Sequence, residues 1–289
     1  MQAHSWQMQA MRFSKYHGLG NDYLVMDEMA LLQSPERIRV ICDRNFGIGS
    51  DGILFGPLPS KSALAGLRIF NPDGSEAEKS GNGIRIFCRH LWEHGSVGAD
   101  PFLLETPGGI VRCRVRDAHR EIEVEMGTVN FWSDMIPVNG TRREVLNENL
   151  DVDGQSVTFS AATIGNPHCV IILDQVDAEL AKRLGPKIER HPLFPNRTNV
   201  QFVKVIDKDK IQIEIWERGA GYTLASGSSS SAAAAVARRL GLCGPNVRVQ
   251  MPGGDLQITI GDQFSITLSG PVTKVGSGTI YDEIFRNSP

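Results

Sequence analysis

Two stretches of this sequence each place a serine and a glycine at the mouth of an expected helix. Ser80 and Gly81 precede the segment 82–92, and Ser226 and Gly227 precede a segment rich in serine and alanine. The first turn of a helix carries unpaired N–H groups and a partial positive charge, and glycine lets a ligand approach that backbone closely. Each stretch therefore predicts a binding site for an anion such as a carboxylate.

The two stretches could act on one ligand. If they face one another, they could hold one carboxylate between them, with Ser80 on one side of the adjoining carbon atom and Ser226 on the other. A more ordinary interpretation is that both serines are helix N-caps and both glycines mark loops. The repetition of the same arrangement favours the binding interpretation.

The composition is that of a globular protein that binds a small molecule. The 289 residues are 41% hydrophobic and 22% charged, with a net charge of −3. This balance disfavours a nucleic acid or an anionic membrane as the main partner. Apolar runs stay well short of the ~18 residues of a membrane span, and Met1 to Ala10 lacks the features of a signal peptide. We therefore expect a cytoplasmic protein.

The residues that commonly bind metals and cofactors are scattered along the chain. The seven histidines do not cluster at ligand spacing, and the sequence has no Walker A or G-x-G-x-x-G motif. The sequence thus predicts no metal site and no cofactor. The five cysteines suggest neither a disulfide framework nor a zinc site, and are expected to be buried thiols: Cys42, Cys88, Cys113, Cys169 and Cys243.

Hydrophobic periodicity predicts the elements that position the two serines. Segments 11–17 and 23–26 read as strands, with Asn21 in a tight turn between them. Helices are expected at 177–185 and 232–240. A buried helix after Ser80 is indicated by one apolar stripe, formed by Ile84, Phe87, Cys88, Leu91 and Trp92.

Each half of the chain shows the same order of several strands, a Ser-Gly stretch with its helix, and further strands. An internal duplication is the economical explanation. The expected fold class is α/β (α+β), with two pseudo-symmetric domains, each a mostly antiparallel sheet rolled around a central helix. The predicted organisation is a leader or tag-like segment at 1–10, an N-terminal domain at 11–126 plus 275–289, a C-terminal domain at 127–274, and a site at their interface, where small-molecule clefts are common.

Six short motifs follow one another in the sequence, at 17–22, 70–71 with 73–76, 80–83, 165–168, 197–199 and 217–221. With these motifs in this order, the sequence from about Met11 to Phe285 resembles the diaminopimelate epimerases, cofactor-independent enzymes of lysine and cell-wall biosynthesis. Six matches in order are far more specific than any single motif. The fold of that family agrees with the duplication described above.

The resemblance implies an isomerase that inverts an amino acid at Cα. In the family one cysteine thiolate removes the proton, and an opposed cysteine thiol delivers another. Ser80 and Ser226 stand where these cysteines are expected, and Tyr222 replaces a usual glutamate. A hydroxyl is a much weaker acid than a thiol, so proton transfer is less favourable.

The substitutions are not confined to the two serines. Because Tyr222 and the run 228–231 also differ from the residues usual in the family, we interpret the chain as a divergent branch rather than an engineered double mutant.

The remaining site residues also follow from the resemblance. The backbone N–H groups expected to bind the reacting α-carboxylate belong to Gly81, Asn82, Gly227 and Ser228. Asn71 and Glu217 would hold the α-ammonium group. The residues that match the pocket for the distal end of the substrate are Asn21, Asn166, Asn199 and Arg218. A glutamine that often adds a contact is replaced here by Gly52, so this contact is absent or supplied otherwise.

The predicted function is cofactor-independent epimerisation of LL-diaminopimelate, or a closely related amino acid, to the meso form, with Ser80 and Ser226 at the acid and base positions. Two alternatives stay open. One is a related cofactor-free isomerase or lyase that acts on a more acidic C–H bond, with Glu76 or Glu78 as base. The other is an inactive Cys-to-Ser variant or pseudoenzyme that binds amino acids. The expected partners are a diaminopimelate-like substrate and a second copy in a homodimer.

Overall fold

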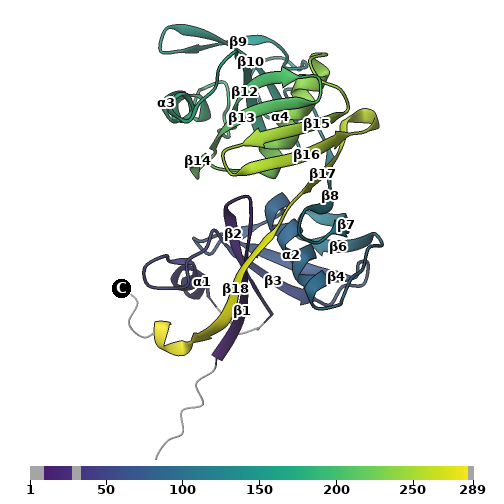
Figure 1. The fold of residues 1–289 in the computed structure, drawn as a ribbon. Helices are drawn as coiled ribbons and strands as arrows, with labels where there is room; N and C mark the ends of the chain where they lie inside the picture. The colour runs from purple at the N-terminus through teal and green to yellow at the C-terminus, as the bar shows by residue number, and fades with distance from the viewer. Residues whose placement is uncertain (1–9, 28–33, 286–289) are drawn as a thin grey trace, which may run out of the picture. The chain divides into compact units, whose positions relative to one another are not determined.

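The computed structural model describes residues 10–27 and 34–285 of the chain. The expected leader therefore lies outside the described residues, apart from Ala10, which begins the first strand. The chain divides into two compact units (Figure 1). The first unit contains the residues up to Ile122 and those from Val272 on, and the second contains Glu123–Pro271.

In its described residues the first unit holds a mixed sheet with two α-helices and one 3-10 helix at 282–285. Its sheet runs in the order β18, β1, β2, β3, β4, β6, β7, with parallel pairing at β2/β3 and β4/β6, and antiparallel pairing elsewhere. The short β5 pairs with β4. Its elements are β1 (Ala10–Gly18), β2 (Asn21–Met26), α1 (Pro35–Cys42), β3 (Ile53–Leu58), β4 (Ala65–Phe70), β5 (Glu76–Ala77), α2 (Gly81–Glu93), β6 (Phe102–Thr106), β7 (Gly109–Asp117) and β18 (Thr273–Tyr281).

Strand β8 (Glu121–Thr128) carries the chain into the second unit. There the order is β9, β10, β11, β12, β13, β15, β16, β17, with parallel pairing at β11/β12 and β13/β15, and β14 on β13. The elements are β9 (Glu148–Val152), β10 (Gln155–Thr163), β11 (Pro167–Ile172), α3 (Ala178–Glu189), β12 (Asn199–Asp207), β13 (Lys210–Glu217), β14 (Gly221–Thr223), α4 (Gly227–Arg239), β15 (Asn246–Met251), β16 (Gly254–Ile260) and β17 (Ser265–Gly270).

The two units repeat one topology. The series β1, β2, α1, β3, β4, β5, α2, β6, β7 matches β10, β11, α3, β12, β13, β14, α4, β15, β16, and the corresponding strand pairs have the same direction. The predicted mixed α/β fold of two similar domains is confirmed. The repetition places the starts of α2 and α4 at equivalent points of their own units.

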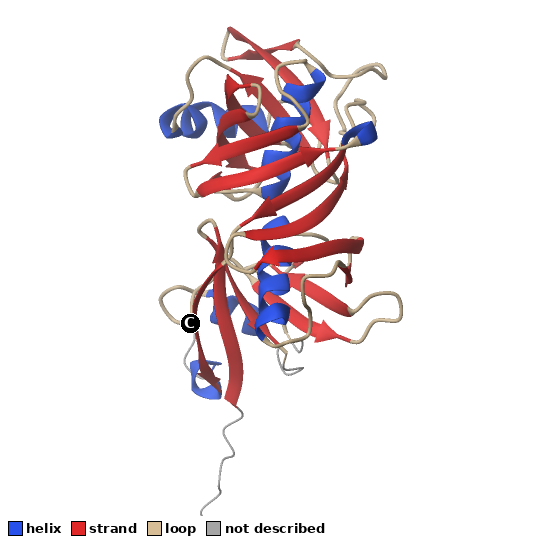
Figure 2. Ribbon diagram, turned by 45° about the vertical axis from the view of Figure 1, so that its right-hand side comes forward, coloured by secondary structure: helices blue, strands red, loops and turns tan. Residues whose placement is uncertain are grey.

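Helices α2 and α4 are largely buried within their units, as strands surround them (Figure 2). Residues 81–89 of α2 are all buried, and residues 232–237 of α4 have no exposed surface. Alanine side chains let the strands approach α4 closely. The hydroxyls of Ser230 and Ser231 donate to the carbonyls of Ser226 (2.8 Å) and Gly227 (2.7 Å), so these polar groups are satisfied inside the helix.

Two helix boundaries differ from the sequence-based expectation. Helix α4 begins at Gly227 instead of residue 232, because the buried serine hydroxyls bond back to the helix rather than to solvent. Helix α3 continues through Pro186 to Glu189, although proline usually ends a helix. Contacts with Trp216 hold this last turn in place: Gly185 has no side chain and lets α3 pack directly against Trp216, whose Cβ lies 2.5 Å from an ideal Gly185 Cβ, and Glu189 accepts from the Trp216 indole.

Two single residues also differ from expectation. Asn21 is the first residue of β2, because the turn is made one step earlier by Leu19 (φ 59°) and Gly20 (φ 91°). Trp92 was expected in the buried stripe of α2, yet 41% of its surface is exposed. It lies near the end of the helix, where the guanidinium of Arg89 packs over its ring.

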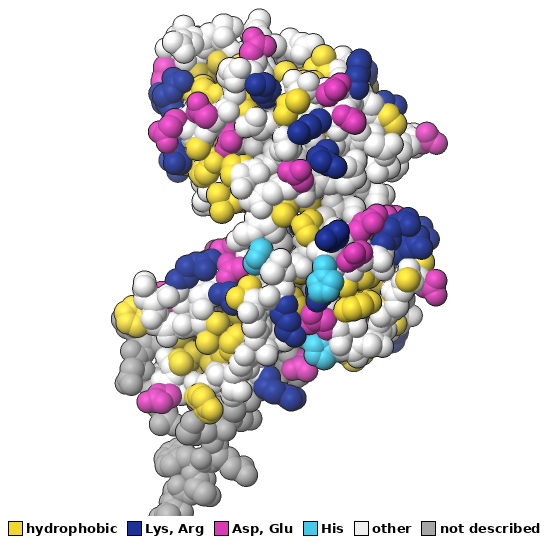
Figure 3. Space-filling view, viewed as in Figure 1, with side chains coloured by type: hydrophobic (Ala, Val, Ile, Leu, Met, Phe, Trp, Pro, Cys, Tyr) yellow, Lys and Arg dark blue, Asp and Glu magenta, His cyan; other side chains and the backbone are white. Residues whose placement is uncertain are grey.

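The surface carries both charge signs. Figure 3 shows acidic and basic side chains interspersed on the face in view, in keeping with the small net charge. Within residues 10–27 and 34–285 no helix is long and apolar enough to cross a membrane. The same residues contain no group of three or more His, Cys, Asp and Glu side chains arranged to hold a metal ion.

The close packing of α3 gives a prediction about stability. Gly185→Ala should lower the free energy of unfolding by about 1–3 kcal/mol, because the overpacking against Trp216 exceeds the gain in helix propensity. Gly98→Ala is the matched control, since a Cβ there meets nothing within 4 Å. Urea unfolding of both variants measures the difference. Equal stability of the two variants would contradict the packing argument.

Candidate functional site

Ser80 and Ser226 occupy the same local structure in their two units. Each is the N-cap of its helix, with extended backbone at φ −142° and −146°. The Ser80 Oγ accepts a hydrogen bond from the Gly83 N–H (3.1 Å), and the Ser226 Oγ accepts one from the Ser229 N–H (3.4 Å). The interpretation of both serines as N-caps is therefore correct. Each hydroxyl oxygen lies at the positive end of a buried helix.

N-capping is compatible with anion binding at the same helix end. Each capping serine accepts the N–H of the third residue of its helix, which is Gly83 in α2 and Ser229 in α4. A helix has four first-turn N–H groups without partners in the helix itself, so the cap does not use those of the first two residues. These are the groups assigned above by resemblance to the α-carboxylate.

Asn71 and Glu217 also occupy equivalent positions. Each stands nine residues before its capping serine, at the point where a strand turns into the short hairpin that leads to the helix. The Asn71 amide donates to the Ser75 hydroxyl (3.0 Å), and the Glu217 carboxylate accepts from the Thr223 hydroxyl (3.2 Å). Both side chains are thus oriented by bonds within their own hairpins.

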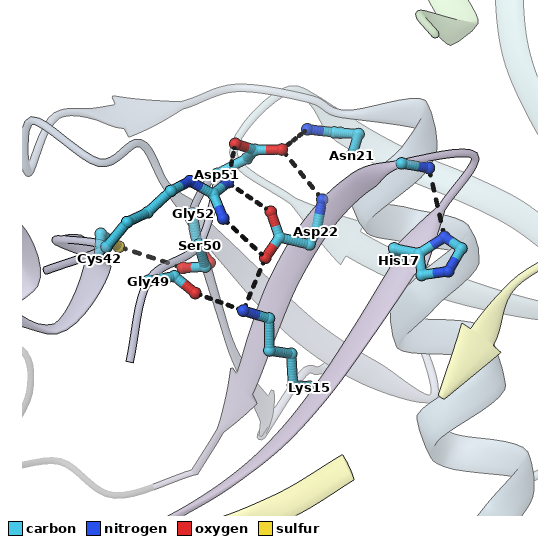
Figure 4. Close-up of polar contacts among 11 residues, drawn as sticks. Lys15, His17, Asn21, Asp22, Cys42, Gly49, Ser50, Asp51 and Gly52 are labelled. Atoms are coloured by element: carbon cyan, nitrogen blue, oxygen red, sulfur yellow. Dashed lines mark hydrogen bonds and ion pairs between the residues drawn. The ribbon is translucent and has the colours of Figure 1, made fainter. Parts of the chain in front are cut away.

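In the first unit, Asn21 and Asn82 contact one another directly. The Asn82 Nδ2 donates to the Asn21 Oδ1 (3.1 Å), and the Asn21 Nδ2 donates to Asp51 (2.9 Å). Asp51 also accepts from the backbone N–H of Asp22 (3.0 Å). Figure 4 shows this end of β2 against the loop that carries Asp51. The structure thus brings two predicted site residues together and fixes the orientation of the Asn21 amide.

A network of four charges supports Asn21 (Figure 4). Asp22 accepts from Lys15 (2.9 Å) and from Arg44 (2.7 Å), and Arg44 also pairs with Asp51 (2.6 Å). Burial opposes ionisation of Asp22, but the bonds from Arg44 and Lys15 outweigh it and lower its pKa. The resemblance assigned no role to this network. Its sequence signal is a pair of aspartates, each next to a glycine-rich turn.

Arg85 is a buried cation on α2, one turn after the helix begins. Its side chain has no exposed surface, and it donates to the Asn82 Oδ1 (3.0 Å) and the Gly81 carbonyl (3.4 Å). Among the described residues it forms no ion pair with a carboxylate. Burial lowers its pKa to about 10, so it remains charged at neutral pH. Arg85 adds to the positive potential at this end of the helix and orients Asn82.

In the second unit, Asn199 anchors the loop that carries Arg218. Its Oδ1 accepts from the Arg218 backbone N–H (2.9 Å), and its Nδ2 donates to the Pro167 carbonyl (2.9 Å). The Arg218 guanidinium donates to the Asn196 carbonyl (3.0 Å), and the residue is exposed. The guanidinium is therefore held at one nitrogen and retains further donors for a ligand carboxylate.

Glu189 is a buried carboxylate that braces the same loop. It is 3% exposed and accepts from the Trp216 indole (2.8 Å), the Gly219 N–H (3.1 Å) and Arg197 (3.3 Å). Sequence pattern alone did not reveal it, because the proline at 186 suggested that the helix had already ended. Its position depends on the continuation of α3 beyond that proline.

Asn166 links a buried histidine to the start of α4. Its Oδ1 lies 3.0 Å from the His168 Nε2, and its Nδ2 lies 3.4 Å from the Ser228 hydroxyl, which in turn lies 3.5 Å from the Ser226 Oγ. Burial lowers the pKa of His168 to about 3. The histidine is therefore neutral at physiological pH and a weak base, which fits a structural hydrogen-bonding role.

The predicted residues thus form separate groups within their own units. The first unit contains Asn21, Asn71, Ser80, Gly81 and Asn82. The second contains Asn166, Asn199, Glu217, Arg218, Ser226, Gly227 and Ser228. Tyr222 also bonds within its own unit, because its hydroxyl donates to Glu214 (2.7 Å). Burial and this hydrogen bond raise the pKa of Tyr222.

Comparison with known proteins identifies the family. A family model described as diaminopimelate epimerase matches residues 13–132 and 160–275. The chain is 60% identical to "Diaminopimelate epimerase 2" of Nostoc sp. over 277 residues, covering 95% of this chain and 97% of that protein. It is 39% identical to "Diaminopimelate epimerase" of Desulfitobacterium hafniense over 281 residues, with 94% and 99% coverage. The chain belongs to the diaminopimelate epimerase family.

Solved structures of low sequence identity share the fold. A hydroxyproline epimerase from Agrobacterium vitis matches with a TM-score of 0.70 and 16% identity, covering 96% of this chain and 94% of that one. A phenazine biosynthesis protein of the PhzF family from Bacillus anthracis matches with a TM-score of 0.69 and 16% identity, covering 94% and 99%. These likenesses establish the architecture of two repeated units.

The buried histidine gives a prediction about acid stability. The pKa of His168 is about 3 in the folded chain and near 6.5 when unfolded, so below pH 6.5 the unfolded state binds a proton that the folded state does not. Lowering the pH from 7 to 5 should therefore reduce the free energy of unfolding by on the order of 2 kcal/mol from this residue. Urea titrations at both pH values should show a smaller decline in His168→Gln than in the exposed control His119→Gln. Equal declines would show that His168 does not cause the loss.

Proposed function

We propose that this chain epimerises LL-diaminopimelate to meso-diaminopimelate without a cofactor, as an isomerase of amino-acid and lysine biosynthesis. The observation that carries this proposal is the 60% identity to a diaminopimelate epimerase over 95% of the chain. Three pairs of the expected site residues stand at equivalent places in the two repeated units, which supports their shared use: Ser80 with Ser226, Asn71 with Glu217, and Asn21 with Asn166. A cytoplasmic location and a homodimer remain predictions of the same proposal.

In this proposal Ser80 and Ser226 act on opposite faces of one α-carbon. One removes the α-proton and the other delivers a proton to the opposite face, so the substrate and product have the same composition. The N–H groups of the first turns of α2 and α4 bind the α-carboxylate and stabilise the negative charge that develops beside Cα. Asn71 and Glu217 hold the α-ammonium group.

The distal end of diaminopimelate is a second amino-acid group with its own carboxylate. We assign it to Asn21, Asn166, Asn199 and Arg218. A planar guanidinium meets a carboxylate with two parallel hydrogen bonds, so Arg218 suits this task. The bonds from Asn199 and from Asn196 support the assignment, because they hold the backbone and one guanidinium nitrogen in place.

A glutamate base in place of the serines is less well supported. Glu76 accepts two bonds from Arg68 (2.7 and 2.9 Å), and this pairing lowers its pKa. A carboxylate held in this way is a weaker base than a free one. Glu78 is exposed and lies before the helix rather than at its cap. The cap positions therefore remain the preferred acid and base.

Deuterium exchange distinguishes the open alternatives. The chain is incubated with LL-diaminopimelate in deuterated water, and α-deuteration and meso product are followed by NMR. Exchange with formation of the meso isomer supports the epimerase. Binding without exchange indicates a pseudoenzyme, and exchange confined to an amino acid with a more acidic C–H bond indicates the related isomerase or lyase.

Restoring thiols at the two cap positions tests the roles of the serines. Ser80→Cys together with Ser226→Cys should raise α-proton exchange roughly 10²–10⁴-fold, since positioned acid–base groups contribute on this scale and thiols ionise more readily than hydroxyls. Either single change should do less, because inversion needs a group on each face. Exchange and binding of diaminopimelate are measured for all four proteins. A double variant that binds but exchanges no faster than the parent would contradict the assignment.

The distal pocket gives a separate prediction. Arg218→Lys should weaken diaminopimelate binding by about 1.5–3 kcal/mol, because a lysine ammonium cannot reproduce both bonds of the guanidinium fork. Binding of an amino acid with a single carboxylate should change much less. Calorimetry with both ligands measures the contrast, and Arg197→Lys serves as a control in the neighbouring turn. Equal losses for both ligands would remove Arg218 from the distal pocket.

A further inference from the structure

Tyr23 brings a second hydroxyl to Ser80. It lies on β2 of the first unit, is 7% exposed, and places its hydroxyl 3.3 Å from the Ser80 Oγ. Gly52 makes room for its ring, because a Cβ at position 52 would lie 2.7 Å from the Tyr23 Cε1. A larger residue at position 52 would collide with the Tyr23 ring and also with the Phe70 carbonyl oxygen. Glycine at position 52 therefore allows the ring to lie where it does.

The geometry allows either oxygen to donate in this hydrogen bond, and relative acidity favours the phenol as the donor. The Ser80 Oγ already accepts the Gly83 N–H (3.1 Å) and still has a second lone pair. A phenol, with an ordinary pKa near 10, is a much stronger acid than an aliphatic alcohol and is the better donor of the two. When the phenol donates, the Ser80 Oγ accepts two hydrogen bonds, from Tyr23 and from the Gly83 N–H. The hydroxyl hydrogen of Ser80 can then point away from both donors.

The second unit has no phenol at the equivalent place, and the hydroxyl near its cap is that of Ser228, 3.5 Å from the Ser226 Oγ. Asn21 and Asn166 occupy equivalent places at the start of β2 and just before β11, and two residues later stand Tyr23 and His168. His168 bonds to Asn166, not to the capping serine of its unit. The two cap serines therefore have different surroundings, although their helices and caps are alike.

We propose that Tyr23 is a positioning residue for Ser80: its hydroxyl donates to Oγ, directs the serine hydrogen toward the substrate and stabilises negative charge on Oγ. The expected effect of Tyr23 on turnover rests on the function proposed above. The hydrogen bond also has a consequence that does not depend on any reaction. A group that donates to the ionised form of an acid lowers the pKa of that acid.

A thiol at the cap position makes that consequence measurable. In Ser80→Cys, the rate of alkylation by iodoacetamide against pH reports the pKa of the new thiol. Interference is small because the five native cysteines are buried, and burial raises the pKa of Cys42 to about 11. Adding Tyr23→Phe should raise the pKa of the thiol by about one unit, which corresponds to the loss of one hydrogen bond to a charged group.

Tyr16 supplies the matched control. It faces Tyr23 directly across the β1/β2 pair, is fully buried, and donates its hydroxyl to Glu93 (2.7 Å) near the other end of α2. Tyr16→Phe removes the same atom from the same sheet and should leave the pKa of the thiol unchanged. A thiol pKa that does not move with Tyr23→Phe, or moves equally with Tyr16→Phe, would overturn the proposal.

Turnover provides the second measurement. In the parent chain, Tyr23→Phe should lower kcat for α-proton exchange about tenfold with little change in KM, since the ring still fills the space over Gly52. A change in KM alone would contradict a role in positioning the acid–base group. If the parent exchanges no proton from diaminopimelate while the thiol pKa moves as expected, the proposed function fails and the Tyr23–Ser80 interaction stands.

Discussion

The bond between a serine hydroxyl and the N–H of the third helical residue is the interaction on which the site depends. It fixes Ser80 at the start of α2 and Ser226 at the start of α4, each at the positive end of a largely buried helix. A buried helix end must have its N–H groups satisfied. The cap satisfies one of them, and in the proposed site a substrate carboxylate binds others, so the same helix ends would serve both the stability of the fold and the affinity for the ligand.

The two units surround this shared geometry differently. In the first, a buried cation, Arg85, and a network of charges orient the Asn82 and Asn21 amides. In the second, Glu189 and Asn199 brace the loop of Arg218, and a neutral His168 holds Asn166. A duplicated fold thus provides two equivalent helix ends, and the polar residues behind them give each end its own electrostatic character.

Much of this arrangement follows from sequence, because hydrophobic periodicity and ordered motifs are local signals. The helices after Ser80 and Ser226, the alternation of strands and the repetition were predictable in this way. The start of α4 and the length of α3 were not, because burial of the serine hydroxyls and the contact of Gly185 with Trp216 are tertiary effects. Asp51, Glu189 and Tyr23 each have a partner at least 27 residues away, which a short sequence window does not contain.

We propose that the first turns of α2 and α4 bind the substrate α-carboxylate, with Cα between the two capping serines. A crystal structure with bound diaminopimelate would show whether they do. We expect one carboxylate within hydrogen-bond distance of the N–H groups of Gly81, Asn82, Gly227 and Ser228, with Cα between the Ser80 and Ser226 hydroxyls and the distal carboxylate on Arg218. A ligand bound with neither carboxylate at these helix ends would show that this proposal is wrong.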